Sequence, residues 1–240
     1  PGGRRGVQHR GGCDLNFAHT PVTPYSTPLA SLPDFVAHMA ALDRPVILLE
    51  GTRNLPSADR PSLVALGQLL AERLPDAVFR TGGADGADDA FAEGVRGLDP
   101  RRIEYVLPRS SHRCGTRHAS SPIYSLEAVD DSHLRAIADH TAAASPDYRR
   151  LTDYFIHERR DGASAAKTRY LLRDTLKVVG APALGLRPAA AGIFYVNADD
   201  PFAGGTGHTV RVCMSAGIPY VFQHRWRGWL GPPVGADHAG

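Results

Sequence analysis

Three glycine-rich stretches hold the residues of this chain that are best suited to bind an anion. They are residues 50–54, 81–88 and 204–209. Glycine lets the backbone approach a ligand closely. The N–H groups at the start of a helix bind anions, because free donors and the helix dipole both favour negative charge. The three stretches therefore predict sites for the phosphate groups of a ligand.

Each stretch adds side chains to these backbone donors. Thr52 supplies a hydroxyl and Arg53 a guanidinium that can pair with a phosphate. In the third stretch, Thr206 and Thr209 supply hydroxyls beside the start of a predicted helix. The residues of the three stretches expected to contact the ligand are Gly51, Thr52, Arg53, Gly82, Gly83, Ala84, Asp88, Gly204, Gly205, Thr206, Gly207 and Thr209.

Hydrophobic patterns predict the elements that position these stretches. Short apolar runs indicate strands at 46–50, 77–80, 103–107, 193–197 and 218–222, with helical spacing between them. Such alternation is typical of an α/β fold, here a Rossmann-like open parallel sheet of about five or more strands with helices on both faces. Ligands of open parallel sheets bind at the carboxyl ends of the strands, where all three glycine-rich stretches fall.

The chain is expected to divide into an arm, one domain and a tail. Residues 1–28 are rich in Gly, Arg, Pro and Thr without apolar periodicity, which predicts an extended or flexible arm. The predicted domain spans 29–230, and 231–240 form a flexible tail. Within the domain, 109–180 interrupts the alternation and is predicted to be a helical insertion. The helices expected in it are 131–144, 147–160 and 164–179.

Composition excludes several classes of protein. The formal net charge of +2 is too near neutral to indicate nucleic acid from bulk charge. Cys13, Cys114 and Cys213 form no CxxC pair, which predicts reduced thiols in a cytoplasmic protein rather than disulfides or a zinc site. No apolar run approaches the roughly 20 residues that span a bilayer, so no membrane partner is expected. We expect no metal, no required cofactor, and a homo-oligomer, dimeric or higher.

The order of these segments resembles the SLOG superfamily, which groups the DprA (Smf) proteins with the Lonely Guy nucleotide hydrolases. The similarity covers most of 45–222 and looks closest to small DprA-like proteins of bacteria and their phages. It implies a nucleotide, a nucleotide derivative or single-stranded DNA as the ligand. The matching segments are Val46-Ile-Leu-Leu-Glu-Gly-Thr-Arg53, Phe79-Arg-Thr-Gly-Gly-Ala-Asp-Gly-Ala-Asp-Asp-Ala-Phe91, Tyr105-Val-Leu-Pro108 and Gly204-Gly-Thr-Gly-His-Thr209.

The third segment departs from the Lonely Guy site pattern, Pro-Gly-Gly-x-Gly-Thr-x-x-Glu. Its glycines match, but His208 stands at the Thr position and Arg211 at the Glu position. A guanidinium cannot act as a general acid or base at neutral pH. We therefore expect nucleoside monophosphates to survive incubation with the protein. Glu50 is the candidate for a substitute catalytic residue, whereas Asp85 and Asp88 are expected to cap a helix.

A few further residues are candidates for binding. His208 and Arg211 lie in the first turns of a predicted helix, which face the ligand in Rossmann folds. Arg169 is a candidate because of the resemblance to the SLOG superfamily. In that superfamily the helix that leads into the fourth strand carries an arginine that faces the ligand. Trp226 and Trp229 are expected to fold back onto the core or to form a subunit interface, with base stacking as the alternative.

Three functions follow from these observations. The leading hypothesis is binding of a nucleotide or a nucleotide-derived phosphate ligand by the glycine-rich loops. The first alternative is a hydrolase that cuts the N-glycosidic bond of a nucleotide, against which Arg211 argues. The second alternative is DprA-like binding of single-stranded DNA in recombination, against which the near-neutral charge argues.

Overall fold

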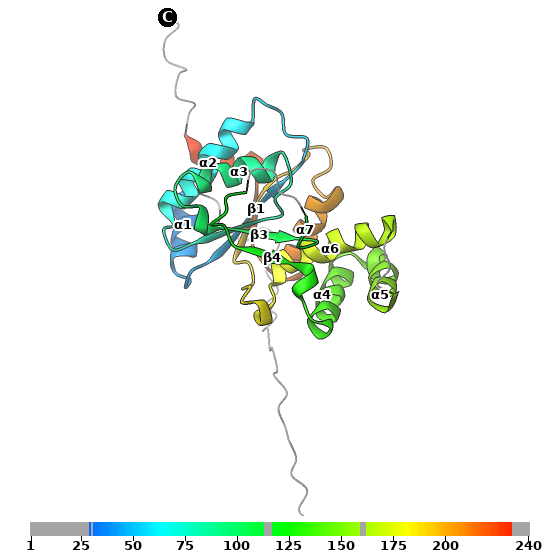
Figure 1. The fold of residues 1–240 in the computed structure, drawn as a ribbon. Helices are drawn as coiled ribbons and strands as arrows, with labels where there is room; N and C mark the ends of the chain where they lie inside the picture. The colour runs from blue at the N-terminus through cyan, green and yellow to red at the C-terminus, as the bar shows by residue number, and fades with distance from the viewer. Residues whose placement is uncertain (1–28, 30, 113–116, 159–161, 232–240) are drawn as a thin grey trace, which may run out of the picture.

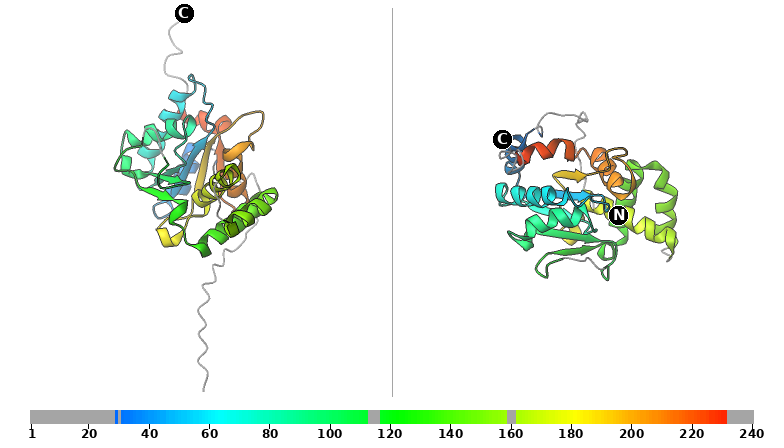
Figure 2. Two further views of the ribbon diagram at one scale, coloured as in Figure 1. Left: turned by 45° about the vertical axis from the view of Figure 1, so that its right-hand side comes forward. Right: turned by 90° about the horizontal axis from the view of Figure 1, so that it is seen from above.

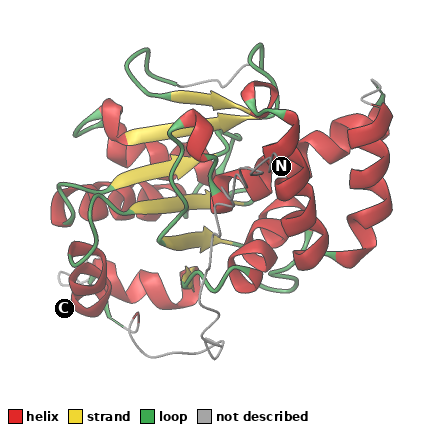
Figure 3. Cartoon of the chain, turned by 90° about the horizontal axis from the view of Figure 1, so that it is seen from below, coloured by secondary structure: helices red, strands yellow, loops and turns green. Residues whose placement is uncertain are grey.

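The computed structural model of the chain describes residues 29, 31–112, 117–158 and 162–231. The predicted arm at 1–28, most of the predicted tail, and Cys13 and Cys114 lie outside the described residues. Six strands form one parallel sheet in the order β4-β3-β2-β1-β5-β6 (Figure 3). The strands are β1 (Val46–Gly51), β2 (Val78–Thr81), β3 (Ile103–Leu107), β4 (Ile123–Ser125), β5 (Ala191–Tyr195) and β6 (Tyr220–Phe222).

Helices cover both faces of this sheet, so the predicted α/β Rossmann-like fold is confirmed. The helices are α1 (Leu32–Ala40), α2 (Arg60–Arg73), α3 (Ala87–Arg96), α4 (Asp131–Ala144), α5 (Arg149–Glu158), α6 (Ala163–Val179), α7 (Gly204–Ser215) and α8 (Gln223–Trp226). Figure 1 shows α1, α2 and α3 on one side of the molecule and α4, α5 and α6 on the other, and Figure 2 shows the same separation from above.

Alternation along the strands assigns side chains to the two faces. Ile47 and Leu49 of β1 pack in the core under α1, α2 and α3. This core also holds Trp226 and Trp229. Leu48, between them, packs with residues of α6 and α7 on the opposite face. Because side chains of a strand alternate with a period of two, Glu50 shares the face of Leu48.

The five predicted strands are all present, but only β3 has the predicted bounds. Strand β1 ends one residue later, β2 begins and ends one residue later, and β5 ends two residues earlier, at Tyr195. The fourth begins two residues earlier than predicted, at Ala191, because Gly192 already pairs with the segment before β6. The fifth begins at Tyr220, because Ile218 and Pro219 belong to the turn after α7. The predicted helical insertion also holds the edge strand β4, which was not predicted. Its three residues are too few to give a periodic pattern, and Ile123 is exposed.

The third glycine-rich stretch opens a helix, as predicted, and forms its first turns rather than a loop before it. Helix α7 begins at Gly204 and contains the whole stretch. Glycine disfavours helix by about 1 kcal/mol per residue relative to alanine, and tertiary contact overrides that preference here. A Cβ at Gly207 would lie 1.9 Å from the carbonyl oxygen of Phe202, so only glycine allows this close packing.

Candidate functional site at the junction of β1 and β5

The strand order places a topological switch point between β1 and β5. From β1 the chain continues to β2 on one side, whereas β5 pairs with β1 on the other. Open parallel sheets bind ligands in the crevice outside the carboxyl ends of the strands at such a point. A cavity of about 520 Å³ lies there, bounded by the end of β1, one face of α6, the segment after β5 and the start of α7.

The cavity brings together about half of the residues predicted from the sequence, and Glu50 lies in its wall as well. Each glycine-rich stretch contributes to it, which only the tertiary structure could establish. The predicted residues that line the cavity are Glu50, Gly51, Thr52, Arg53, Ala84, Asp88, Gly204, Gly205 and Thr206.

The start of α7 presents backbone donors to this cavity. No side chain caps the helix at Ala203, and the first intrahelical bond runs from the N–H of Gly207 to the carbonyl of Ala203. The backbone N–H groups of Gly204, Gly205 and Thr206 therefore have no acceptor within the helix, as at any helix start. Thr206 ties this turn to the sheet, because its hydroxyl donates to the carbonyl of Gly51 over 2.9 Å. A helix start of this kind has the donors and the dipole that favour an anion.

Five charged side chains form a buried cluster beside this turn. Lys177 contacts the carboxylate of Glu50 and lies 2.8 Å from that of Asp174, and Arg173 Nη1 lies 3.3 Å from Asp174. Asp88 completes the cluster, and all five residues are at most 6% exposed. Buried charges are normally paired, so each cation here compensates a carboxylate that burial would otherwise neutralise.

Burial and charge act differently on the two acids that face Lys177. Burial raises the pKa of Glu50 to about 7, and the attraction of Lys177 only partly opposes this effect. Burial would also raise the pKa of Asp174, but Arg173 and Lys177 outweigh it and hold that pKa below its ordinary value. Asp174 is therefore the ionised partner of the cations, whereas Glu50 exchanges its proton near neutral pH.

Arg173, which lines the cavity, has one buried hydrogen-bond donor without a partner among the described residues. This donor is Nε. A Cβ at Gly82 would lie 1.8 Å from Arg173 Nη1, so glycine at this position makes room for the guanidinium. Gly82 was predicted to contact the ligand directly, but it does not line the cavity. Its role in this structure is to admit Arg173.

Asp88 does not cap its helix, contrary to expectation. The N-cap of α3 is Gly86, without a side-chain hydrogen bond to the helix. The carboxylate of Asp88 accepts instead from the N–H of Gly51 over 2.9 Å and from the N–H of Ala84 over 3.3 Å. Asp88 thus fastens the end of β1 to the loop after β2, because both segments donate to one carboxylate.

Other predicted residues lie away from the cavity. Gly83, Gly207 and Thr209 are not part of its lining. Arg169 lies over the ring of Phe155, with 5.2 Å from its Cζ to the ring centroid. Arg211 donates from Nε to the hydroxyl of Ser145 and from Nη1 to the carbonyl of Phe202. Both guanidinium groups contact the helical insertion or the loop before α7 rather than the cavity.

His208 is enclosed by the helical insertion. It has no exposed surface, and its ring nitrogens lie 3.1 Å from the hydroxyls of Ser145 and Thr175. Burial lowers the pKa of His208 to about 4, so the ring is neutral at physiological pH. Its place between α4, α6 and α7 gives it a structural role in joining the insertion to the sheet.

Three cluster members, Arg173, Asp174 and Lys177, were missed from the sequence. Charges at helical spacing on 164–179 resemble an ordinary solvated face. Lys177, however, stands between Leu176 and Val178 in an apolar run, on a helix whose second half is buried. A charge inside the buried stripe of a helix requires a partner, and that pattern was the available signal.

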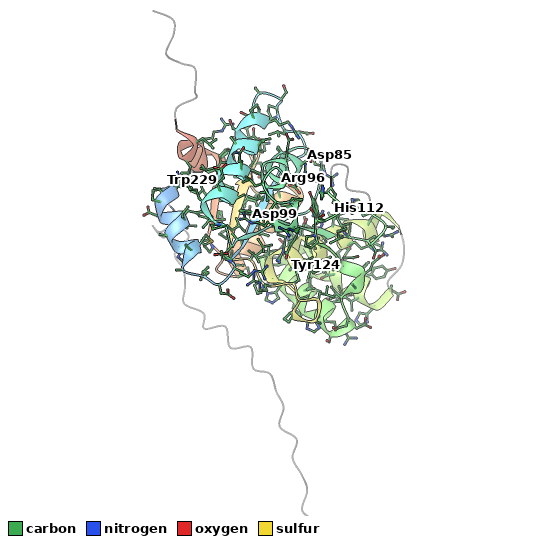
Figure 4. All side chains as sticks on the ribbon, turned by 60° about the vertical axis from the view of Figure 1, so that its left-hand side comes forward. Asp85, Arg96, Asp99, His112, Tyr124 and Trp229 are labelled. Carbon is green, nitrogen blue, oxygen red and sulfur yellow. The ribbon has the colours of Figure 1, made fainter. Side chains whose placement is uncertain are left out.

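The predicted burial of the two tryptophans is confirmed. Trp226 has no exposed surface and donates from its indole N–H to the carbonyl of Phe194, and Trp229 is 9% exposed. In Figure 4, Trp229 lies on the opposite side of the view from Asp85 and His112. Neither ring lines the cavity, and both form part of the core beneath α1 and α2.

Comparisons with known proteins give one similarity of structure. No family model matches the chain, and no curated protein matches it. A solved structure of DNA processing protein A from Helicobacter pylori, described for its single-stranded DNA binding mode, is 14% identical with a TM-score of 0.45. The match covers 75% of this chain and 65% of that one. The fold assignment rests on the sheet order of the chain itself.

Two further observations concern membrane insertion and metal binding. None of the described helices is long and apolar enough to cross a lipid bilayer. In the part of the chain that the structure describes, no three His, Cys, Asp or Glu side chains are grouped to hold a metal ion.

Proposed function

We propose that this protein binds a nucleotide, or a nucleotide-derived ligand with a phosphate, in the cavity between β1 and β5. One observation carries the proposal. The uncapped start of α7 and Arg173, whose buried Nε has no hydrogen-bond partner among the described residues, line the same cavity at the switch point of the sheet. Both offer hydrogen-bond donors with positive charge, which is what a phosphate requires.

The carboxylates narrow the class of ligand. Glu50, Asp88 and Asp174 line the cavity together with the donors. Ionised carboxylates accept hydrogen bonds and repel anions, so they fit ribose hydroxyls rather than additional phosphates. A molecule with one anionic end and a sugar matches both sets of groups. A nucleoside monophosphate therefore suits this cavity better than inorganic phosphate or a polyphosphate.

Calorimetry with nucleoside 5′-monophosphates and the corresponding nucleosides tests the proposal. The monophosphates should bind at least about tenfold more tightly, because a charge-assisted hydrogen bond contributes about 1.5–3 kcal/mol. Equal affinity for nucleosides would refute a phosphate site. Short single-stranded oligodeoxynucleotides belong in the same titration, since single-stranded DNA is the other partner expected from the sequence.

Gly205→Asp locates the phosphate. A Cβ at Gly205 would lie 3.1 Å from the Asp174 carboxylate, so the new carboxylate would enter the cavity at the start of α7. We expect this variant to lose binding of the monophosphates. Gly228→Asp is the matched control, because a Cβ at Gly228 meets nothing within 4 Å and this residue lies outside the cavity. Unchanged affinity in a folded Gly205→Asp protein would remove α7 from the site.

A hydrolase acting on the N-glycosidic bond is the second candidate, favoured by Glu50. Its carboxyl lies in the wall of the cavity, is 2% exposed and has a pKa of about 7. An acid or base with a pKa near the working pH transfers protons most effectively. In such a reaction water attacks C1′, the C1′–N bond breaks, and Glu50 either removes the proton of the water or protonates the departing base.

Release of free base distinguishes the two candidates. The wild-type protein and Glu50→Gln are incubated with nucleoside monophosphates, and the products are separated by chromatography. A simple binding protein leaves the substrate intact. Base and ribose 5-phosphate in equal amounts, formed by the wild type and lost in Glu50→Gln, would establish the hydrolase. Binding of the monophosphate by both proteins keeps a negative result interpretable.

A further inference from the structure

One aromatic ring occupies the wall of the cavity beside the charged cluster. Among the described residues that line the cavity, Tyr170 is the sole aromatic one, and it is half-buried. It lies on α6 three residues before Arg173, so both side chains share one face of the helix. The Arg173 Cζ lies 5.5 Å from the centroid of the Tyr170 ring. The ring is thereby fixed against a buried cation.

Two further groups surround this ring. The Cζ of Arg53, from the segment after β1, lies 6.0 Å from the ring centroid. The ring of His112, from the segment after β3, lies 6.1 Å away and nearly perpendicular, at 83°. Figure 4 labels His112 on the same side of the view as Asp85, in the loop after β2. Residues from the segments after β1 and β3 and from α6 thus converge on Tyr170.

Arg53 differs from Arg173 in its freedom to move. Arg53 is exposed, whereas Arg173 is buried in the cluster. A flat ring placed between two flat groups needs about 7 Å, which is twice the optimal contact of about 3.5 Å. The present spacing of 6.0 Å between Arg53 and the ring is therefore about 1 Å too short for such a ring. An exposed arginine can supply that distance by a change of rotamer.

The volume of the cavity leaves room for more than a sugar phosphate. At about 520 Å³ it falls within the range of about 300–1,000 Å³ that is usual for clefts holding small molecules. The backbone donors of α7 and the charged cluster occupy only part of its wall. Tyr170 and Arg53 provide the remaining stacking surface, and phenol and guanidinium groups both stack on nucleobases.

We infer that Tyr170 is the base-recognition residue of this site, and that a nucleobase stacks on its ring beneath the guanidinium of Arg53. The inference rests on the proposed binding of a nucleotide and adds the place of its base. Stacking on an aromatic ring tolerates all bases, because each has a π-face. The site therefore discriminates between nucleotides and other sugar phosphates more strongly than between one base and another.

Affinities for nucleoside 5′-monophosphates and for ribose 5-phosphate test this inference. The wild type should bind the monophosphates more tightly, by about 5- to 150-fold, the range that corresponds to loss of one stacked base. Tyr170→Leu should remove this preference and leave the affinity for ribose 5-phosphate unchanged. Tyr170→Phe should retain it, because the ring remains. Tyr154→Leu is the matched control, since Tyr154 on α5 is 53% exposed and lies outside the cavity.

The outcomes separate this inference from the proposed function. If neither ligand binds the wild type, the proposed function fails. If ribose 5-phosphate binds as tightly as the monophosphates, only the stacking site is refuted, and an equal loss of both ligands in Tyr170→Leu refutes it too. A 2-aminopurine nucleotide gives a second measurement on the wild type, independent of any variant. Stacking should quench its fluorescence on binding, and unchanged emission from the bound nucleotide would contradict the inference.

Discussion

The buried carboxyl of Glu50 makes the stability of the fold depend on pH in an unusual direction. Its pKa rises from an ordinary value of 4.5 to about 7 in the folded chain, mainly through burial. Below pH 4.5 the group is protonated in both the folded and the unfolded state, and it contributes no difference. Above pH 7 it is ionised in both states, and the folded state carries the full cost of the buried charge. Stability contributed by this group is therefore lost as the pH rises from 4.5 to 7.

The size of this effect follows from the two pKa values. The interval between 4.5 and about 7 corresponds to about 3 kcal/mol, at about 1.4 kcal/mol for each pH unit. Gln has the shape of Glu but stays neutral. Glu50→Gln should therefore gain up to about 3 kcal/mol relative to the wild type between pH 4.5 and pH 8.

Urea denaturation at several pH values between 4.5 and 8 measures this change. The quantity of interest is the difference in unfolding free energy between Glu50→Gln and the wild type, because titrating groups distant from Glu50 cancel in it. Glu72→Gln is the matched control, since Glu72 is an exposed carboxylate on α2. A difference that stays constant with pH for Glu50→Gln would refute the assignment of Glu50 as a destabilised, buried acid.

Three further measurements test the packing of the strand end at Gly51 and of the two cores that hold Trp226 and Cys213. Gly51→Ala should destabilise the chain by about 2–3 kcal/mol in urea denaturation, because a Cβ there would lie 2.3 Å from the carbonyl oxygen of Tyr195. A wild-type midpoint would contradict this. Trp226→Ala should cost about 3–5 kcal/mol, since the side chain has no exposed surface, and a loss below 1 kcal/mol would show that the core closes around the gap. Burial raises the pKa of the Cys213 thiol well above its ordinary value. Iodoacetamide, followed by peptide mass spectrometry, should label it slowly in the native chain and rapidly in urea; equal rates would place Cys213 at the surface.

The local sequence sufficed for most of the fold because the strands are marked by their own residues. All six residues of β1 are buried, and the apolar run at 46–50 shows this without knowledge of any partner. Strand β4 has only three residues, one of them exposed, so no periodic pattern marks it. A helix start in the third stretch was predicted, whereas the packing of Gly207 on Phe202, which offsets the low helix propensity of glycine, depends on the tertiary structure.

The candidate site was likewise predicted only in part from the sequence. Glycine-rich stretches after β1 and at α7 were predicted from the sequence, because a parallel sheet brings the ends of its strands to one edge. Which predicted residues reach the cavity could not be predicted. Gly82 makes room for Arg173, and Arg211 contacts Ser145, since each position depends on helices that pack from distant parts of the chain.

The sequence by itself placed glycine-rich stretches at the carboxyl edge of a parallel sheet, and the tertiary structure decided which charged groups surround them. Local composition specifies backbone donors, because these require only glycines and a helix start. The state of Glu50 depends instead on the face it shares with Leu48 and on its contact with Lys177 of α6. Charge and burial act through space between elements that are distant in sequence, so the acid with a pKa near 7 arises only when β1 and α6 come together.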